Sequence, residues 1–274
     1  MSGSDFGALV LSELVAFGLI TCRIAGFVVA SPFPGAHVPR SQKVGLVLAL
    51  SWFVASMRWA PAAVGARALL GAMGQQPEFA VDASLIPLVW SELGVGLLVG
   101  LVVRTALSAA EIAGEFISHA TGLSSASVFD PFAGVESTVL SRVVTLFAML
   151  VFVLSGAHRV AIGYLVSSFG SLPIGTVTHP ENAALELAHV AASAVAIGLR
   201  LALPSVAASL VIQAALALVA RVAPSLQIFN VGLGVLIAAG LHVFAASLGD
   251  MSTWFLEVSS AIPDTLDRVL GAIS

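Results

Sequence analysis

Three ionisable residues on one helical face are the first candidates for chemistry. Glu111, Glu115 and His119 follow one another at four-residue intervals, which places them on one side of a helix. Such a stripe could bind a metal or relay protons, but helical sites of that kind need paired Glu-x-x-His motifs, and Glu186 with His189 supplies one. We favour a polar stripe facing a water-filled lumen or a neighbouring subunit, and expect no metal.

Charged residues also interrupt the apolar segments. Ionisable groups at membrane depth are costly and usually face a protein interior. They could serve proton- or ion-coupled transport, or form structural pairs between helices or subunits, and the sequence does not pair them. The residues concerned are Arg23, Glu92, Arg104, Arg142 and Arg200.

Sequence patterns for catalysis are missing. The chain has no His-Glu-x-x-His, no P-loop and no nucleotide-binding glycine motif after a strand. Near-matches to intramembrane protease motifs fail at Ser247 and Val153. Cys22 is the only cysteine, so neither an internal disulfide nor a thiolate cluster can form. We expect a protein that is not an enzyme and uses no cofactor.

Composition indicates a membrane protein. Of the 274 residues, 58% are hydrophobic and 9% charged, with a mean hydropathy of +1.04. Soluble domains carry about 25% charged residues, so this surface must face lipid or similar subunits. The net charge of −4 is scattered, and no basic patch indicates nucleic-acid binding.

The elements that must position these residues are apolar helices. The runs 8–30, 84–110 and 229–249 suit membrane spans, which need about 20 apolar residues. The runs 43–57 and 138–154 are shorter, and 183–219 is long and contains Pro204, which predicts a kinked helix or two half-helices. We predict an all-α membrane protein of hydrophobic helical hairpins, several kinked, packed in a multi-subunit assembly.

Small residues and the C-terminus complete the organisation. Gly96 with Gly100, and the series 110, 114, 118 and 122, recur at the spacing that lets helices approach closely. Residues 251–274 form an apolar stripe with charges mostly off it, which predicts an amphipathic helix broken or bent near Pro263. We treat 1–274 as one domain.

A soft segment interrupts the apolar helices at 122–136, GLSSASVFDPFAGVE. Its serines, Asp130, Pro131 and Gly134 should not sustain a helix. Irregular backbone at membrane depth is tolerated only where it is buried in protein or lines a water-filled cavity. The segment is therefore either a surface loop or a segment that lines or plugs a path through the membrane.

Ordered motifs resemble the FliR family of flagellar export-gate proteins, related to the SctT subunit of injectisomes. Three segments resemble those of the family in the same order. They are residues 31–51, which lead into an apolar helix, the central block 113–175 and the segment 220–237. The motif residues, which we take as candidates for helix packing and assembly together with Gly96 and Gly100, are Gly114, Glu115, His158, Pro173, Gly175, Arg221, Pro224 and Phe229.

The resemblance implies a subunit of the gate through which unfolded flagellar substrates cross the bacterial inner membrane, at the flagellar basal body. It implies FliP-like and FliQ-like gate partners and FlhB-like and FlhA-like export components. It also implies that 122–136 plugs the closed channel. The plug candidates are Gly122, Leu123, Ser124, Ser125, Phe129, Asp130, Pro131 and Phe132.

Physical properties of the segment agree with a plug. Phe129 and Phe132 supply apolar bulk, and the residue before Pro131 avoids the helical region. A segment that makes few strong contacts opens at a low cost in free energy, as a channel seal must. Two alternatives remain: a small-solute secondary transporter with a broken helix at Pro204 and an anion on Arg200, or an injectisome subunit of the SctT type.

Overall fold

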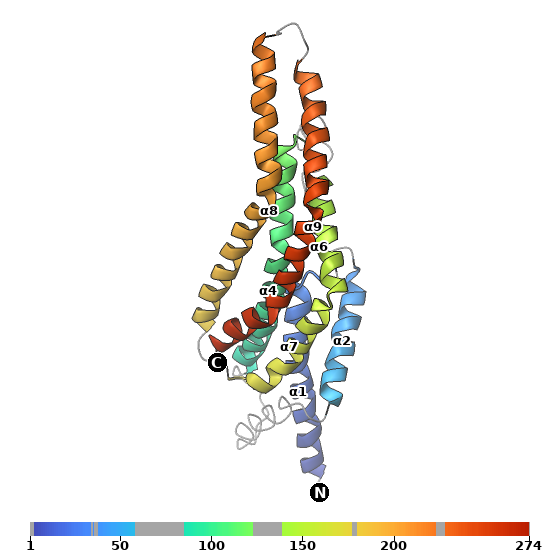
Figure 1. The fold of residues 1–274 in the computed structure, drawn as a ribbon. Coiled ribbons are helices and arrows are strands. Elements are labelled where there is room, and N and C mark those ends of the chain that lie inside the picture. The colour runs from blue at the N-terminus through green and yellow to red at the C-terminus, as the bar shows by residue number, and fades with distance from the viewer. Residues whose placement is uncertain are drawn as a thin grey trace. The chain divides into compact units, whose positions relative to one another are not determined.

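The computed structural model describes residues 3–33, 35, 38–57, 85–122, 139–176, 180–222 and 228–273. Within these residues there is no strand, and the prediction of an all-α protein is confirmed (Figure 1). The helices are α1 (Gly3–Ala30), α2 (Arg40–Ser56), α4 (Leu85–Ala120), α6 (Val139–Leu154), α7 (Ala157–Ser171), α8 (Pro180–Val222) and α9 (Ile228–Gly271).

In the part of the chain that the structure describes, four helical stretches are long and apolar enough to cross a membrane. They are Glu13–Ala30, Leu85–Ala120, Ala184–Val222 and Gly234–Gly271, and α6 with α7 would make a fifth span. Helices suit this environment because every backbone hydrogen bond is made within the segment. The prediction of a membrane protein is confirmed.

Among the described residues, Pro204 and Pro263 lie in the interior of long helices. α8 runs through Pro204, so the alternative of two half-helices for 183–219 is wrong. α9 runs through Pro263, so residues 251–271 are the last part of a long helix rather than a helix of their own. A proline removes one backbone hydrogen bond, and apolar helices tolerate this where neighbouring groups satisfy the freed carbonyl.

A glycine turn separates α6 from α7. α6 ends at Leu154, and Gly156 adopts a left-handed φ of 76°, which ends helices without the steric cost that a side chain would add. The apolar pattern does not predict α7, because His158, Arg159 and several serines interrupt it.

The helices form two compact units, which are described separately. The first comprises Met1–Arg104, His158–Val190 and Ala261–Ser274. α1 packs on α2, and its buried residues include Ile20, Ile24 and Phe27. α7 contributes Leu165 and Phe169 to the buried interior. The end of α9 contributes its apolar stripe, in which Ile262, Leu266, Val269, Leu270 and Ile273 are all buried.

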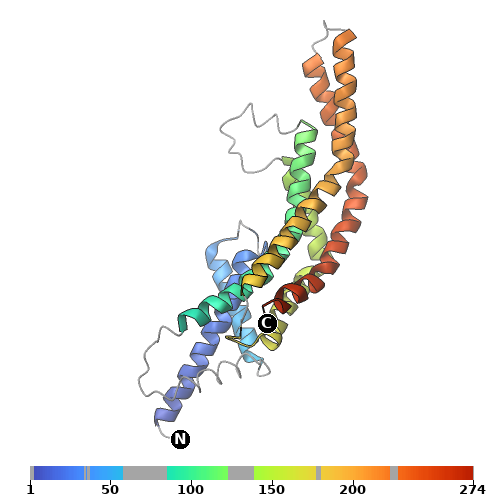
Figure 2. The ribbon, with the colours of Figure 1, turned by 90° about the vertical axis from the view of Figure 1, so that its left-hand side faces the viewer.

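The second unit comprises Thr105–Ala157 and Ala191–Ser260. Here the C-terminal half of α4 contacts α6 at Ser141 and α8 at Gly198. Within this unit α8 and α9 run side by side in both views (Figures 1 and 2). A Cβ placed on Gly232 of α9 would lie 3.3 Å from the side chain of Leu216 of α8. Phe147 of α6 and Phe255 of α9 make an edge-on ring contact at 6.3 Å.

Candidate functional site

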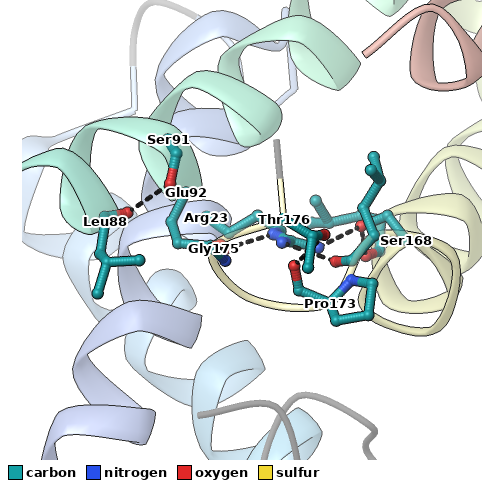
Figure 3. Close-up of polar contacts among 10 residues, drawn as sticks. Arg23, Leu88, Ser91, Glu92, Ser168, Pro173, Gly175 and Thr176 are labelled. Atoms are coloured by element: carbon teal, nitrogen blue, oxygen red, sulfur yellow. Dashed lines mark hydrogen bonds and ion pairs between the residues drawn. The ribbon is translucent and has the colours of Figure 1, made fainter. Parts of the chain in front are cut away.

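A buried ion pair joins α1 to α4 in the first unit. Arg23 Nε donates to Glu92 Oε2 at 2.7 Å, and both side chains are 0% exposed. Uncompensated charges are not tolerated in such a place, because removing an ion from water costs several kcal/mol even after relaxation. The pair must therefore be satisfied by further polar groups, and α7 with the turn after it supplies them (Figure 3).

Each nitrogen of the Arg23 guanidinium donates a hydrogen bond, and two of the three acceptors lie in that region. Nη1 donates to Ser168 Oγ at 3.2 Å, and Nη2 donates to the carbonyl oxygen of Leu172 at 3.1 Å. Ser168 in turn donates its hydroxyl proton to the carbonyl oxygen of Leu165 at 2.7 Å. The Phe169 ring centroid lies 4.3 Å from Arg23 Cζ, a cation–π distance. One arginine thus anchors the end of α7 to α1.

The turn at 173–176 supplies the partner for the second carboxylate oxygen. Thr176 N donates to the Pro173 carbonyl oxygen at 3.2 Å, and Gly175 has a φ of 81°. A positive φ at the third position is the type II pattern, which favours glycine. The amide of Gly175 is free of the turn's own bond and donates to Glu92 Oε1 at 3.2 Å.

Small residues bring the two charged helices together. A Cβ placed on Gly96 would overlap the carbonyl oxygen of Arg23, and one on Gly26 would overlap that of Leu93. One on Gly100 would lie 2.7 Å from the carbonyl oxygen of Phe27. Gly96 and Gly100 therefore serve packing of α4 against α1 within the chain, whereas any part in assembly with other subunits stays a prediction.

This cluster is suited to holding structure rather than to catalysis. Both ionised groups are fully buried, and their hydrogen bonds are directed at fixed backbone and hydroxyl partners. A charge-assisted set of this kind sets geometry, since each bond has a defined direction. We interpret the cluster as the clamp that fixes α7 and its following turn on α1 and α4.

Sequence reasoning did not find this clamp. It identified Arg23, Glu92, Pro173 and Gly175 separately, but not the pairing, nor Ser168 and Phe169. One local signal was available: Arg23 and Glu92 each precede a glycine, Gly26 and Gly96, by about one helical turn. Where two helices pack closely, water has little room beside a charged side chain. Such a side chain therefore requires an oppositely charged or hydrogen-bonding partner.

The stripe of α4 lies in the second unit and is exposed. Glu111 is exposed, and the side chains of Glu115 and His119 are 38% and 67% exposed. His119 Nε2 lies 3.8 Å from Glu115 Oε2. Within the part of the chain that the structure describes, no group of three or more His, Cys, Asp or Glu is placed to hold a metal.

The other charges within apolar segments are also on the surface. Arg104 of α4, Arg142 of α6 and Arg200 of α8 are exposed, as is Arg221 at the end of α8. Because α8 is continuous, Arg200 does not lie beside the broken helix that the transporter hypothesis requires. The structure brings none of these arginines into the clamp.

The remaining packing candidates divide into described and undescribed residues. A Cβ on Gly114 would lie 2.5 Å from Ser141 Cα, so Gly114 marks the close crossing of α4 and α6. His158 is the second residue of α7, and its ring centroid lies 6.2 Å from that of Phe33. Pro224 lies outside the described residues, and for Phe229 only its place in the first turn of α9 is described.

The plug candidates fall almost wholly outside the described residues. α4 ends at Ala120, and Gly122 follows with a left-handed φ of 76°. Leu123, Ser124, Ser125, Phe129, Asp130, Pro131 and Phe132 lie in the undescribed range 123–138. Their role stays a prediction from the sequence.

Comparison with known proteins identifies the family. The family described as bacterial export proteins, family 1, matches residues 14–262. The flagellar biosynthetic protein FliR of Escherichia coli K12 is 31% identical over 64% of this chain and 69% of its own length. The protein of that name from Pectobacterium carotovorum is 33% identical over 66% and 69%, and that from Bacillus subtilis 168 is 27% identical over 94% and 95%. The chain belongs to the FliR family of flagellar export-apparatus membrane proteins.

Proposed function

We propose that this chain is a core subunit of the flagellar type III export gate. In this role it helps form the channel that passes unfolded flagellar substrates across the bacterial inner membrane. The observation that carries the proposal is the family match over 249 of 274 residues, from 14 to 262. The described residues add four helices of membrane-spanning character. The role is structural, so it requires no catalytic group, cofactor or metal.

FliP-like and FliQ-like subunits are the proposed partners within the gate, with FlhB-like and FlhA-like components beside it. The lengths of α8 and α9, 43 and 44 residues, support burial among other subunits. At 1.5 Å per residue each reaches about 65 Å, whereas the hydrocarbon core is about 30 Å thick. Lipid cannot cover all of their exposed apolar side chains, which on α8 include Leu210, Val211 and Leu218.

Co-purification tests this proposal directly. The tagged chain is extracted from its native host in mild detergent, and the proteins that accompany it are identified and quantified by mass spectrometry. We expect FliP-like and FliQ-like subunits at a fixed ratio. A lone, monodisperse chain that transports a small solute in liposomes would contradict the gate and favour a transporter. The flagellar name of the relatives favours the flagellar over the injectisome assignment.

We further propose that residues 122–136 close the channel between export events. The sequence supports this through its bulky Phe129 and Phe132 among small polar residues, with Asp130-Pro131 excluding a helix. Replacing 124–132 by glycine and serine at equal length should leave assembly intact and let ions leak. The control is the same replacement in 177–179, before α8. A tight membrane with an assembled gate would contradict the plug.

A further inference from the structure

We propose that the outward face of α2 binds an anionic phospholipid of the surrounding bilayer. The negatively charged headgroup lies at Arg40 and Lys43, in the first turn of the helix. One acyl chain lies along Val44, Leu48 and Trp52. The inference needs only that the chain is a membrane protein, and so it does not depend on the proposed gate.

α2 is the second arm of a helical hairpin with α1, within the first unit. α1 ends at Ala30, α2 begins at Arg40, and the two helices pack on each other. They lie side by side in both views (Figures 1 and 2). The stretch Glu13–Ala30 of α1 is long and apolar enough to cross a membrane. Because α2 lies alongside this stretch, it lies at the same depth in the bilayer.

The outward face of α2 is a continuous apolar ridge. Val44, Leu48 and Trp52 follow one another at four-residue steps, which makes them neighbours on the helix surface. Their exposed fractions are 58%, 48% and 72%, whereas Ser51 and Val54 on the inner side are buried. An apolar surface of this kind at membrane depth must be covered, either by lipid or by another helix.

The length and layout of the ridge match a phospholipid. The first turn of α2, Arg40 to Lys43, is wholly polar, and the outward face beyond it is apolar as far as Trp52. From Arg40 to Trp52 the helix rises about 18 Å, at 1.5 Å per residue. One leaflet contributes about 15 Å of hydrocarbon, half of the bilayer core. A lipid has the same order, a charged headgroup followed by an apolar tail of that depth.

The charges at the start of the ridge select the sign of the headgroup. Arg40 is exposed and Lys43 is half-exposed, and within the described residues neither forms an ion pair. Arg23 of the same unit is different, since a carboxylate, a hydroxyl and a carbonyl hold it in a buried site. The long stems of Arg40 and Lys43 can lie along the apolar surface while their charges reach the headgroup layer. Two cations at that level attract an anionic headgroup over a neutral one.

Photocrosslinking from the middle of the ridge tests the inference. The photoreactive amino acid p-benzoylphenylalanine replaces Leu48, and the full chain is purified with the subunits that accompany it. The sample is reconstituted in vesicles of equal amounts of phosphatidylglycerol, which is anionic, and phosphatidylcholine, which has no net charge. After illumination, mass spectrometry identifies the adduct and its headgroup. The experiment is repeated with Arg40→Gln plus Lys43→Gln, and with the charge-retaining control Arg40→Lys plus Lys43→Arg.

We expect phosphatidylglycerol adducts to exceed phosphatidylcholine adducts on the order of tenfold, because each cation near the headgroups favours the anionic lipid about three- to fivefold. The double glutamine variant should bring the two adducts close to equal amounts, and the charge-retaining control should keep the excess. If the double variant is not recovered, Lys43→Gln alone should lower the ratio about threefold.

Two results would overturn the inference. Lipid adducts with equal shares of both headgroups in the parent would show that α2 faces the bilayer without selecting an anionic lipid. An adduct to an accompanying protein would place a partner helix over the ridge, which the exposed small residues Gly45 and Ala49 beside it would admit. Neither result bears on the gate, which is tested by the co-purification of its other subunits at a fixed ratio.

Discussion

Glu92 and Glu111 lie on the same helix, α4, and have opposite surroundings. Glu92 is 0% exposed and bonded to Arg23 and to the Gly175 amide, whereas Glu111 is exposed. Burial makes the first carboxylate dependent on its partners, and exposure makes the second independent of them. The comparison indicates that α4 carries a charge held by buried partners in one unit and solvent-exposed charges in the other.

The largest effect is expected from Glu92→Ala. It leaves the guanidinium of Arg23 buried without a counter-ion and the Gly175 amide without an acceptor, which should cost about 3–5 kcal/mol. The thermal unfolding midpoint and the yield of purified complex measure it. Glu111→Ala is the matched control on the same helix, with an expected change within about 0.5 kcal/mol. Equal losses in both variants would remove the distinction between the two carboxylates.

Removing both charges of the clamp should be milder than removing one. Arg23→Met with Glu92→Met replaces an ion pair by apolar side chains of similar length, so no buried charge stays uncompensated. We expect the double variant to be more stable than Glu92→Met alone by about 1–3 kcal/mol. A double-mutant cycle on unfolding midpoints measures this coupling. Losses that simply add would show that the two charges act separately.

The close approach of α1 and α4 predicts opposite effects for two neighbouring glycines. Gly96→Ala would drive a methyl group into the backbone of Arg23, which cannot move as a side chain can, and should cost about 1–3 kcal/mol. Gly94→Ala has nothing within 4 Å of its Cβ and should gain about 0.5–1 kcal/mol through helix propensity. Unfolding midpoints of the two variants provide the measurement. If both substitutions changed the stability in the same direction, α1 and α4 would be less closely packed at Gly96 than described.

The helices were predictable from sequence because apolar length is a local property. Runs such as 84–110 and 138–154 correspond to α4 and α6, since apolar segments inside a membrane satisfy their backbone hydrogen bonds by forming helices. Pro204 and Pro263 do not end their helices, so the predicted breaks are wrong while the kink and the bend stay predictions, because the cost of a proline depends on what its neighbours can satisfy. α7 was missed because its serines and His158 disrupt the apolar pattern.

The clamp was not predictable because its partners are distant in the chain. Arg23 and Glu92 are separated by 69 positions, and Arg23 and Leu172 by 149. Nothing local to either charge says which of the other ionisable residues faces it. The sequence motif that contains Pro173 and Gly175 does coincide with a turn. The hydrogen bond from the Gly175 amide to Glu92, however, is visible only in the folded chain.

The smallest effect is expected at a second attachment of α7, which is exposed. Tyr164 Oη donates to Asp267 Oδ2 at 2.9 Å, joining α7 to the end of α9 within the first unit. Tyr164→Phe removes this hydrogen bond and keeps the ring, so water can replace the lost partner and the cost should stay below about 1 kcal/mol. Unfolding midpoints compare it with Ser168→Ala, which takes a hydroxyl from the buried clamp on the same helix and leaves an Arg23 donor without its acceptor. We expect Ser168→Ala to reduce stability more than Tyr164→Phe, because a polar group left unsatisfied inside the protein cannot hydrogen-bond to water instead. A larger loss in Tyr164→Phe would mean that α7 is positioned chiefly by α9, and the clamp would then be a secondary attachment.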